Sequence, residues 1–132
     1  MTNFPFYRES WRSMTTAEIT ERREIRALND RLRKVMPRSH DVIVFAGALS
    51  QEDQRHHAAV YQAARNFTAF TEDNDPHGEH DCASFEVTFA GKKSLYAFKI
   101  DYYDLNLEYG SEFPADPKLT RRVMTLMYAD DR

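Results

Sequence analysis

The chain has 132 residues, of which 42% are hydrophobic and 30% are charged, with a formal net charge of −3 at pH 7. This length suits one domain that buries a core without disulfides, so we expect a single domain over residues 1–132, with 1–14 as an N-terminal arm packed on it. The single cysteine, Cys82, excludes an internal disulfide and suits a reducing compartment. No apolar run approaches the roughly 20 residues that span a bilayer, and no signal peptide is evident. We therefore expect a cytoplasmic protein with no membrane partner.

The first predicted element is a helix over residues 16–36. Thr15 and Glu18 have the spacing of a capping box, in which each side chain satisfies a free backbone amide of the first turn. Apolar residues then recur at steps of three and four, including Leu28 and Leu32, and Pro37 ends the pattern. The many basic residues are interpreted as the solvated outer face of this helix. Few aromatic residues accompany them, so we do not expect direct nucleic-acid binding.

Residues 41–46 form a short apolar run rich in β-branched side chains, which predicts a strand buried on both faces. A second helix is expected to begin in the segment 50–53, where Ser50 is a suitable N-cap and acidic residues follow. Its inner face would contain Val60, Ala64 and Phe67.

The second half of the chain is aromatic-rich and alternates apolar with polar residues over 82–90 and 94–103, which predicts two strands joined by a hairpin turn at 91–93. Prolines at 114 and 117 make the following segment a loop, and residues 120–128 are predicted to form a last strand buried on both faces. The predicted fold class is therefore α+β, with two helices packed on one antiparallel sheet of about four strands.

Between the two halves lies a polar joint, residues 73–81, in which Asp75-Pro76-His77-Gly78 fits a type I turn. Residues 71–81 contain five acidic residues and no Lys or Arg. Imidazole and carboxylate groups could bind zinc, iron or manganese here, and the alternative metal site would consist of His77, Glu79, His80 and Asp81. The other interpretation is a structural turn whose Asp and Asn side chains bond nearby amides, and on it we expect no metal and no cofactor.

Two further features offer reactive groups. Asp101 and Asp104 end a predicted strand, where paired carboxyls could act as acid and base, although alternation in a strand points them in opposite directions. Cys82 follows His80, but no nearby positive charge would hold a thiolate, so an idle thiol is expected.

Four ordered motifs resemble a family of small bacterial proteins of unknown function, often encoded on plasmids and other mobile elements. The motifs are NDPHGEHD at 74–81, IDYYD at 100–104, GSE at 110–112 and TRRVMTLM at 120–127. The resemblance extends from about residue 29 to residue 128. It implies a mobile-element context and supplies no activity.

Two functional hypotheses follow from the sequence. The first is a non-enzymatic interaction protein of a mobile element, such as an anti-CRISPR or anti-restriction inhibitor that binds a host defence nuclease subunit through an acidic surface. The second is a small metal-dependent hydrolase that uses the joint. We favour the first, because no complete catalytic set is recognisable in the sequence. The expected partner-binding residues are Glu72, Asp73, Asp75, Glu79, Asp81, Asp101 and Asp104. Of these, Glu72, Asp73 and Glu79 are expected to be the most exposed.

Overall fold

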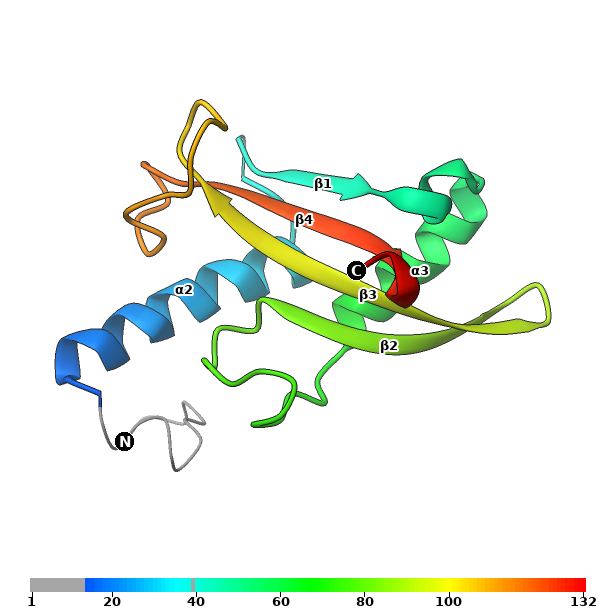
Figure 1. Cartoon of the computed structure of the whole chain (residues 1–132), viewed down its shortest axis with the longest axis horizontal. Helices are drawn as coiled ribbons and strands as arrows, with labels where there is room; N and C mark the ends of the chain where they lie inside the picture. The colour runs from blue at the N-terminus through cyan, green and yellow to red at the C-terminus, as the bar shows by residue number, and fades with distance from the viewer. Residues whose placement is uncertain (1–13, 39) are drawn as a thin grey trace.

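The computed structural model describes residues 14–38 and 40–132. In this part of the chain two α-helices and four β-strands form an α+β fold, which confirms the predicted fold class (Figure 1). Except for Met14, the predicted N-terminal arm lies outside the described residues. In chain order the elements are α2 (Thr16–Lys34), β1 (Val42–Phe45), the 3-10 helix η1 (Gly47–Gln51), α3 (Gln54–Asn66), β2 (Cys82–Phe89), β3 (Lys92–Tyr103), β4 (Arg121–Tyr128) and the 3-10 helix η2 (Ala129–Asp131).

The sheet has the strand order β1-β4-β3-β2 and is mixed, not fully antiparallel. Strands β2, β3 and β4 pair antiparallel as predicted, whereas β1 runs parallel to β4 at the edge. The connection explains this correction. Helix α3 carries the chain from β1 at one edge to β2 at the other, and a helical crossover of this kind joins strands that run in the same direction. Strands β2 and β4 also run in the same direction, because each is antiparallel to β3, so β1 is parallel to β4.

Strand β1 is less buried than the sequence indicated. It is a four-residue edge strand, and Val44 is 37% exposed. Both helices lie on the other face of the sheet from the viewer in Figure 1, so the opposite face has no helical layer in the described part of the chain. The prediction that β1 is buried on both faces is therefore wrong.

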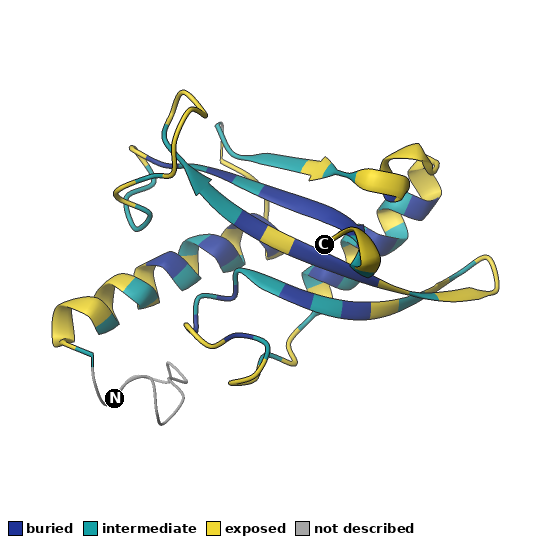
Figure 2. Ribbon diagram, viewed as in Figure 1, coloured by how far each residue is buried: buried dark blue, intermediate teal, exposed yellow. Residues whose placement is uncertain are grey.

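The alternating pattern of the strands determines which side chains face the helices. Tyr96, Phe98 and Ile100 of β3 are buried, and in the register of the sheet Phe98 stands opposite Leu126 and Ile100 opposite Met124 of β4. These residues form one core cluster with side chains from both helices. Figure 2 shows the buried positions concentrated in the two central strands and on the inner faces of the helices.

Helix α2 begins as predicted. The Thr15 hydroxyl accepts a hydrogen bond from the Glu18 amide, and the Glu18 carboxylate accepts one from the Thr15 amide, each at 3.1 Å. The helix ends at Lys34, two residues earlier than predicted. Pro37 accounts for this early end, because a proline ring disfavours helical geometry in the residue before it. Leu32 is 1% exposed, whereas Leu28 is only partly buried.

Two turns differ in detail from the prediction. Helix α3 begins after the N-cap Asp53, whose carboxylate accepts from the His56 amide at 3.0 Å. It begins later than predicted because Ser50 and Gln51 belong to η1 and Glu52 is the C-cap of η1. The β2–β3 hairpin turns at Ala90 and Gly91, which both have positive φ, and this is the geometry of a tight two-residue turn. None of the helices in the described residues is long and apolar enough to span a membrane.

Candidate functional site

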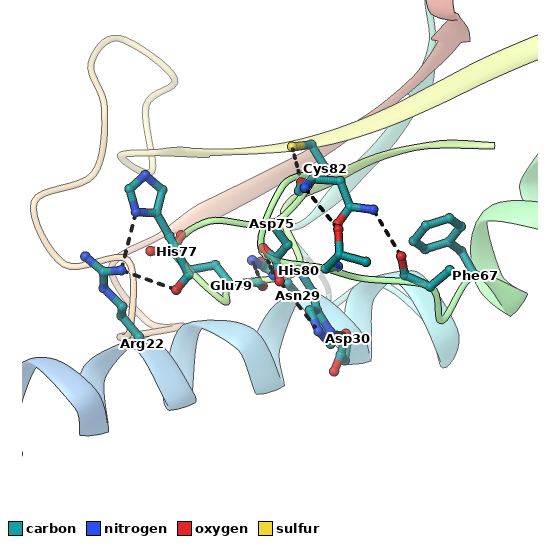
Figure 3. Close-up of polar contacts among 12 residues, drawn as sticks. Arg22, Asn29, Asp30, Phe67, Asp75, His77, Glu79, His80 and Cys82 are labelled. Atoms are coloured by element: carbon teal, nitrogen blue, oxygen red, sulfur yellow. Dashed lines mark hydrogen bonds and ion pairs between the residues drawn. The ribbon is translucent and has the colours of Figure 1, made fainter. Parts of the chain in front are cut away.

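The acidic loop, residues 71–81, is ordered by its own hydrogen bonds (Figure 3). The Gly78 amide donates to the Asp75 carbonyl oxygen at 3.0 Å, which confirms the predicted turn. The Asn74 side-chain oxygen accepts from the Thr71 amide at 2.7 Å, which is the local bonding of side chain to backbone amide that the structural-turn interpretation expects, although it is not the Asx-turn geometry. The acidic loop is therefore a defined structure between α3 and β2.

His80 lies between two carboxylates. Its Nδ1 is 2.9 Å from Asp30 Oδ1 on α2, and its Nε2 is 3.7 Å from Asp75 Oδ2. The Asp75 side chain is completely buried and also accepts from the His80 amide at 3.1 Å. The imidazole ring stacks on Phe70 at a centroid distance of 3.7 Å. His80 thus connects the acidic loop to α2 and is closed off from solvent.

Arg33 of α2 is fully buried and is therefore an exception to the interpretation of the basic residues as an outer face, whereas Arg23, Arg31 and Lys34 are exposed. Its Nη1 donates to the carbonyl oxygens of Ala64 and Phe67, at 2.7 and 3.0 Å, where a cation complements the C-terminal end of α3. The guanidinium also lies 5.2 Å from the Phe70 ring centroid, and its Nη2 donates to Asp30 at 3.2 Å. Arg33 therefore fixes the two helices to each other.

Asn29 holds a second group of buried bonds. Its Nδ2 donates to the Glu79 carbonyl oxygen at 3.0 Å and to the Tyr102 hydroxyl at 2.7 Å, and its Oδ1 accepts from Arg122 Nε at 2.9 Å. The Tyr102 hydroxyl donates in turn to Glu79 Oε1 at 2.8 Å, and the Arg122 guanidinium lies 5.0 Å from the Tyr102 ring centroid. Through these contacts Asn29 joins α2, the acidic loop, β3 and β4.

Burial changes the protonation of this region. It raises the pKa of Asp75, of Glu79 and of Asp81, and in Asp81 the nearby charge of Asp101 raises it further. For Asp30 burial also acts to raise the pKa, but the hydrogen bond and charge of His80, together with Arg33, hold the pKa below its ordinary value. The carboxyls of Asp75, Glu79 and Asp81 are therefore harder to ionise than free carboxyls.

The four alternative metal ligands do not come together. His77 lies 3.3 Å from Arg22, His80 lies between Asp30 and Asp75, and the Glu79 carboxylate accepts from Tyr102. Within residues 14–38 and 40–132, no group of three or more His, Cys, Asp or Glu side chains has an arrangement that could hold a metal ion.

The expected partner-binding residues differ in accessibility. Glu72 and Asp73 are exposed, as predicted, and Asp81 is partly exposed. Asp75 is completely buried, and Glu79 is partly buried, so the prediction that Glu79 is among the most exposed residues is wrong. The reason is that Glu79 accepts a hydrogen bond from a tyrosine of β3 and thus points into the protein.

The strand-end carboxyls have local partners. Asp101 pairs with Lys99 at 3.2 Å, and Asp104 Oδ1 accepts from the amides of Asn106 and Glu108 at 3.1 and 3.0 Å. They therefore do not act as a carboxyl pair. Burial and the neighbouring Asp81 raise the pKa of Cys82, which supports the expectation of an idle thiol. The expectation that no positive charge lies near this thiol is wrong, because Arg132 Nη2 donates to Cys82 Sγ at 3.6 Å and partly offsets the raised pKa.

Sequence reasoning did not identify Asn29, Asp30, Arg33 or Arg122 as members of a cluster. A signal was nevertheless present, because Asn29 lies four residues after the buried Ile25 and three before the buried Leu32, on the apolar face of the helix. A polar residue in that position needs buried hydrogen-bond partners.

The fold is that of a small α+β protein with two helices on one face of a mixed sheet. Asn29, Asp30, Arg33 and Arg122 belong to a buried polar network that fastens the acidic loop to α2 and to the sheet. The chain belongs to the family described as Protein of unknown function (DUF3768), whose sequence model matches residues 45–131. This confirms the expectation of a family of unknown function. The match includes the acidic loop, β3 and β4, whereas α2 and its Asn29 lie outside it. Comparisons with curated proteins and with solved structures gave no match.

Proposed function

We propose that the chain is a non-enzymatic binding protein that attaches to a basic surface of a host protein in the cytoplasm. The sequence resembles proteins encoded on mobile elements, and such elements benefit from blocking host defence. The proposed partner is therefore a subunit of a restriction or CRISPR nuclease, whose nucleic-acid channel is basic.

One observation carries the proposal: several carboxyls of the acidic loop lie at the surface of the molecule. Glu72 and Asp73 are exposed, and burial together with the charge of Asp101 raises the pKa of the partly exposed Asp81. Cationic groups of a partner would favour the ionised form of Asp81, so docking would relieve a repulsion that exists in the free protein.

The internal bonding of the region supports binding in preference to catalysis. The carboxylates of Asp75 and Glu79 and the Nδ1 of His80, which a hydrolase would use, are engaged in hydrogen bonds within the chain. The alternative of a metal-dependent hydrolase would require these contacts to be exchanged for a metal, and it is tested by the metal content of the purified protein.

The experiment measures inhibition of DNA cleavage by a panel of purified restriction and CRISPR nucleases. We expect the wild-type protein to inhibit at least one of them, and we expect the Glu72→Lys/Asp73→Lys variant to inhibit it more weakly, mainly through a slower and more salt-dependent association. The matched control is Glu86→Lys/Asp130→Lys, which makes the same charge change at exposed positions elsewhere. Absence of inhibition across the panel, or equal inhibition by both double variants, would contradict the proposal.

A further inference from the structure

The loop between β3 and β4, residues 104–119, is held rigidly by hydrogen bonds. In its first half the Asp104 carboxylate accepts from two backbone amides, and the Asp104 amide donates to the Tyr109 carbonyl oxygen at 2.9 Å. In its second half the Thr120 hydroxyl, on a residue that is 1% exposed, donates to the Phe113 carbonyl oxygen at 2.6 Å and lies 2.7 Å from the Ser111 hydroxyl. The β3–β4 loop is therefore preorganised.

This loop nevertheless presents large apolar side chains to solvent. Tyr109 is 73% exposed, Phe113 56% and Leu119 46%, and Leu105 and Leu107 are exposed to similar extents as Leu119. Isolated exposed apolar residues are ordinary, but several together on one rigid loop are typical of an interaction site. These apolar side chains add little to the free energy of folding, because much of their surface remains in contact with water.

Four of these five exposed side chains border an open hollow with a volume of about 610 Å³. Leu105, Tyr109, Phe113 and Leu119 supply its apolar lining, and Asp104 and Glu112 are its charged groups. The size would admit one or two large side chains of a partner, and the open shape favours a segment of a protein over an enclosed small molecule.

A second, acidic groove adjoins this hollow, because Glu112 and Phe113 line both. The groove lies between α2 and the β3–β4 loop, and its other carboxylates are Glu21, Glu24 and Asp116. Among the described residues, no Lys, Arg or His lines either depression. An apolar hollow therefore continues into a strip of negative charge.

We propose that the hollow of the β3–β4 loop and the adjoining acidic groove bind a partner-protein segment in which an aromatic or aliphatic side chain is followed by Lys or Arg residues. The apolar side chain occupies the hollow beside Phe113, and the basic side chains lie along Glu21, Glu24 and Asp116. This inference rests on the proposed binding function and assigns the anchor of the partner to a surface distinct from Glu72 and Asp73.

The charge pattern selects this class of partner. Nucleic acids and anionic membranes would be repelled by the carboxylates of the groove. A symmetric pairing of two copies would place the same carboxylates against each other, which is also unfavourable. A basic and apolar protein segment satisfies both parts of the surface.

The test uses the full chain and a short fluorescent peptide in which Phe and Leu are followed by Arg and Lys, with binding measured by fluorescence anisotropy. We expect this peptide to bind, and we expect weaker binding by one comparison peptide with Glu in place of Arg and Lys and by another with Ser in place of Phe and Leu. Phe113→Ser and Tyr109→Ser should each weaken binding about tenfold, the loss typical of truncating an anchor residue. Leu95→Ser, at a residue that is 50% exposed on β3, is the matched control and should bind like the wild type.

Charge and location are tested separately. Glu21→Lys/Glu24→Lys should weaken binding of the basic peptide and reduce its salt dependence, and NMR amide shifts on binding should be largest around Gly110, which lines the hollow. Equal binding of all three peptides, or an equal effect of Phe113→Ser and Leu95→Ser, would overturn the inference. Phe113-dependent binding of duplex DNA or phosphatidylserine vesicles would overturn it, as would Phe113-dependent self-association of the chain in sedimentation.

The two proposals can fail independently. Peptide binding needs no nuclease, so its loss in Phe113→Ser supports the hollow even if no nuclease is inhibited. Conversely, nuclease inhibition that depends on Glu72 and Asp73 but not on Phe113, with no peptide binding, would leave the proposed function standing and refute the hollow.

Discussion

Replacing Asn29 by Ala should destabilise the protein more than any substitution of an exposed polar residue. Asn29 is completely buried and makes three side-chain hydrogen bonds. The two neutral bonds are worth about 1 kcal/mol each, and the bond from the charged Arg122 about 1.5–3 kcal/mol. Alanine is the better helix former by about 0.6 kcal/mol, which offsets part of the loss. The net expected loss is therefore about 3–4 kcal/mol.

The assay is urea denaturation, in which the midpoint should fall at an unchanged slope. The control Asn106→Ala removes the same side chain from an exposed loop position and should stay within about 0.5 kcal/mol of the wild type. A double-mutant cycle with Tyr102→Phe should give a coupling energy of about 0.5–3 kcal/mol, because Asn29 and the Tyr102 hydroxyl are in direct contact. An unchanged midpoint for Asn29→Ala, or no coupling in the cycle, would refute the assignment of Asn29 as the centre of the network.

Three further predictions concern packing, pH and metal. Leu32→Ala should cost about 2–5 kcal/mol in denaturation and Leu28→Ala less, because Leu32 is 1% exposed whereas Leu28 is only partly buried. Because the pKa of Asp81 is raised in the folded protein, this carboxyl contributes stability below its ordinary pKa of 3.8, and that stability is lost as the pH rises through the raised pKa. The Asn side chain does not titrate, so the stability of Asp81→Asn relative to the wild type should increase from about pH 3 to about pH 7. The lowered pKa of Asp30 has the opposite sign, so Asp30→Asn should lose most at neutral pH and least in acid; equal pH profiles for the two variants would contradict both assignments. Elemental analysis of untagged protein should find no stoichiometric zinc, iron or manganese, because the candidate ligands have other partners, and near-stoichiometric metal would favour the hydrolase.

The local elements could be predicted because each depends on residues close together in the chain. The capping box of α2, the turn at 75–78 and the alternation of β3 are set by spacings of two to four residues, and the structure confirms them. The direction of β1 could not be predicted in this way, because it depends on α3 crossing the sheet before β2 begins.

The candidate site was predicted only in part, since the sequence indicates which groups are acidic but not where they point. Glu72 and Asp73 lie at exposed positions of the acidic loop. Asp75 and Glu79 are acidic residues of the same loop but point into the protein. Asp75 is enclosed together with His80, and Glu79 accepts a hydrogen bond from the Tyr102 hydroxyl. The difference arises from groups that lie up to 23 positions away in the chain.

The sequence alone determined the α+β class, the helix and strand positions within a few residues, and the acidity of the loop, because short-range periodicity and composition express these properties directly. Only the tertiary structure decided that Asn29 and Arg33 point inward, that the acidic loop is fastened to α2, and that the β3–β4 loop presents an apolar hollow beside an acidic groove. The hollow depends on hydrogen bonds within its own loop, such as those of Thr120 with Phe113 and Ser111. The inward positions of Asn29 and Arg33 depend on contacts between residues that are 31 to 93 positions apart, such as Arg33 with Ala64 and Asn29 with Arg122. Such contacts form only where packing brings the elements together, so no local pattern specifies them.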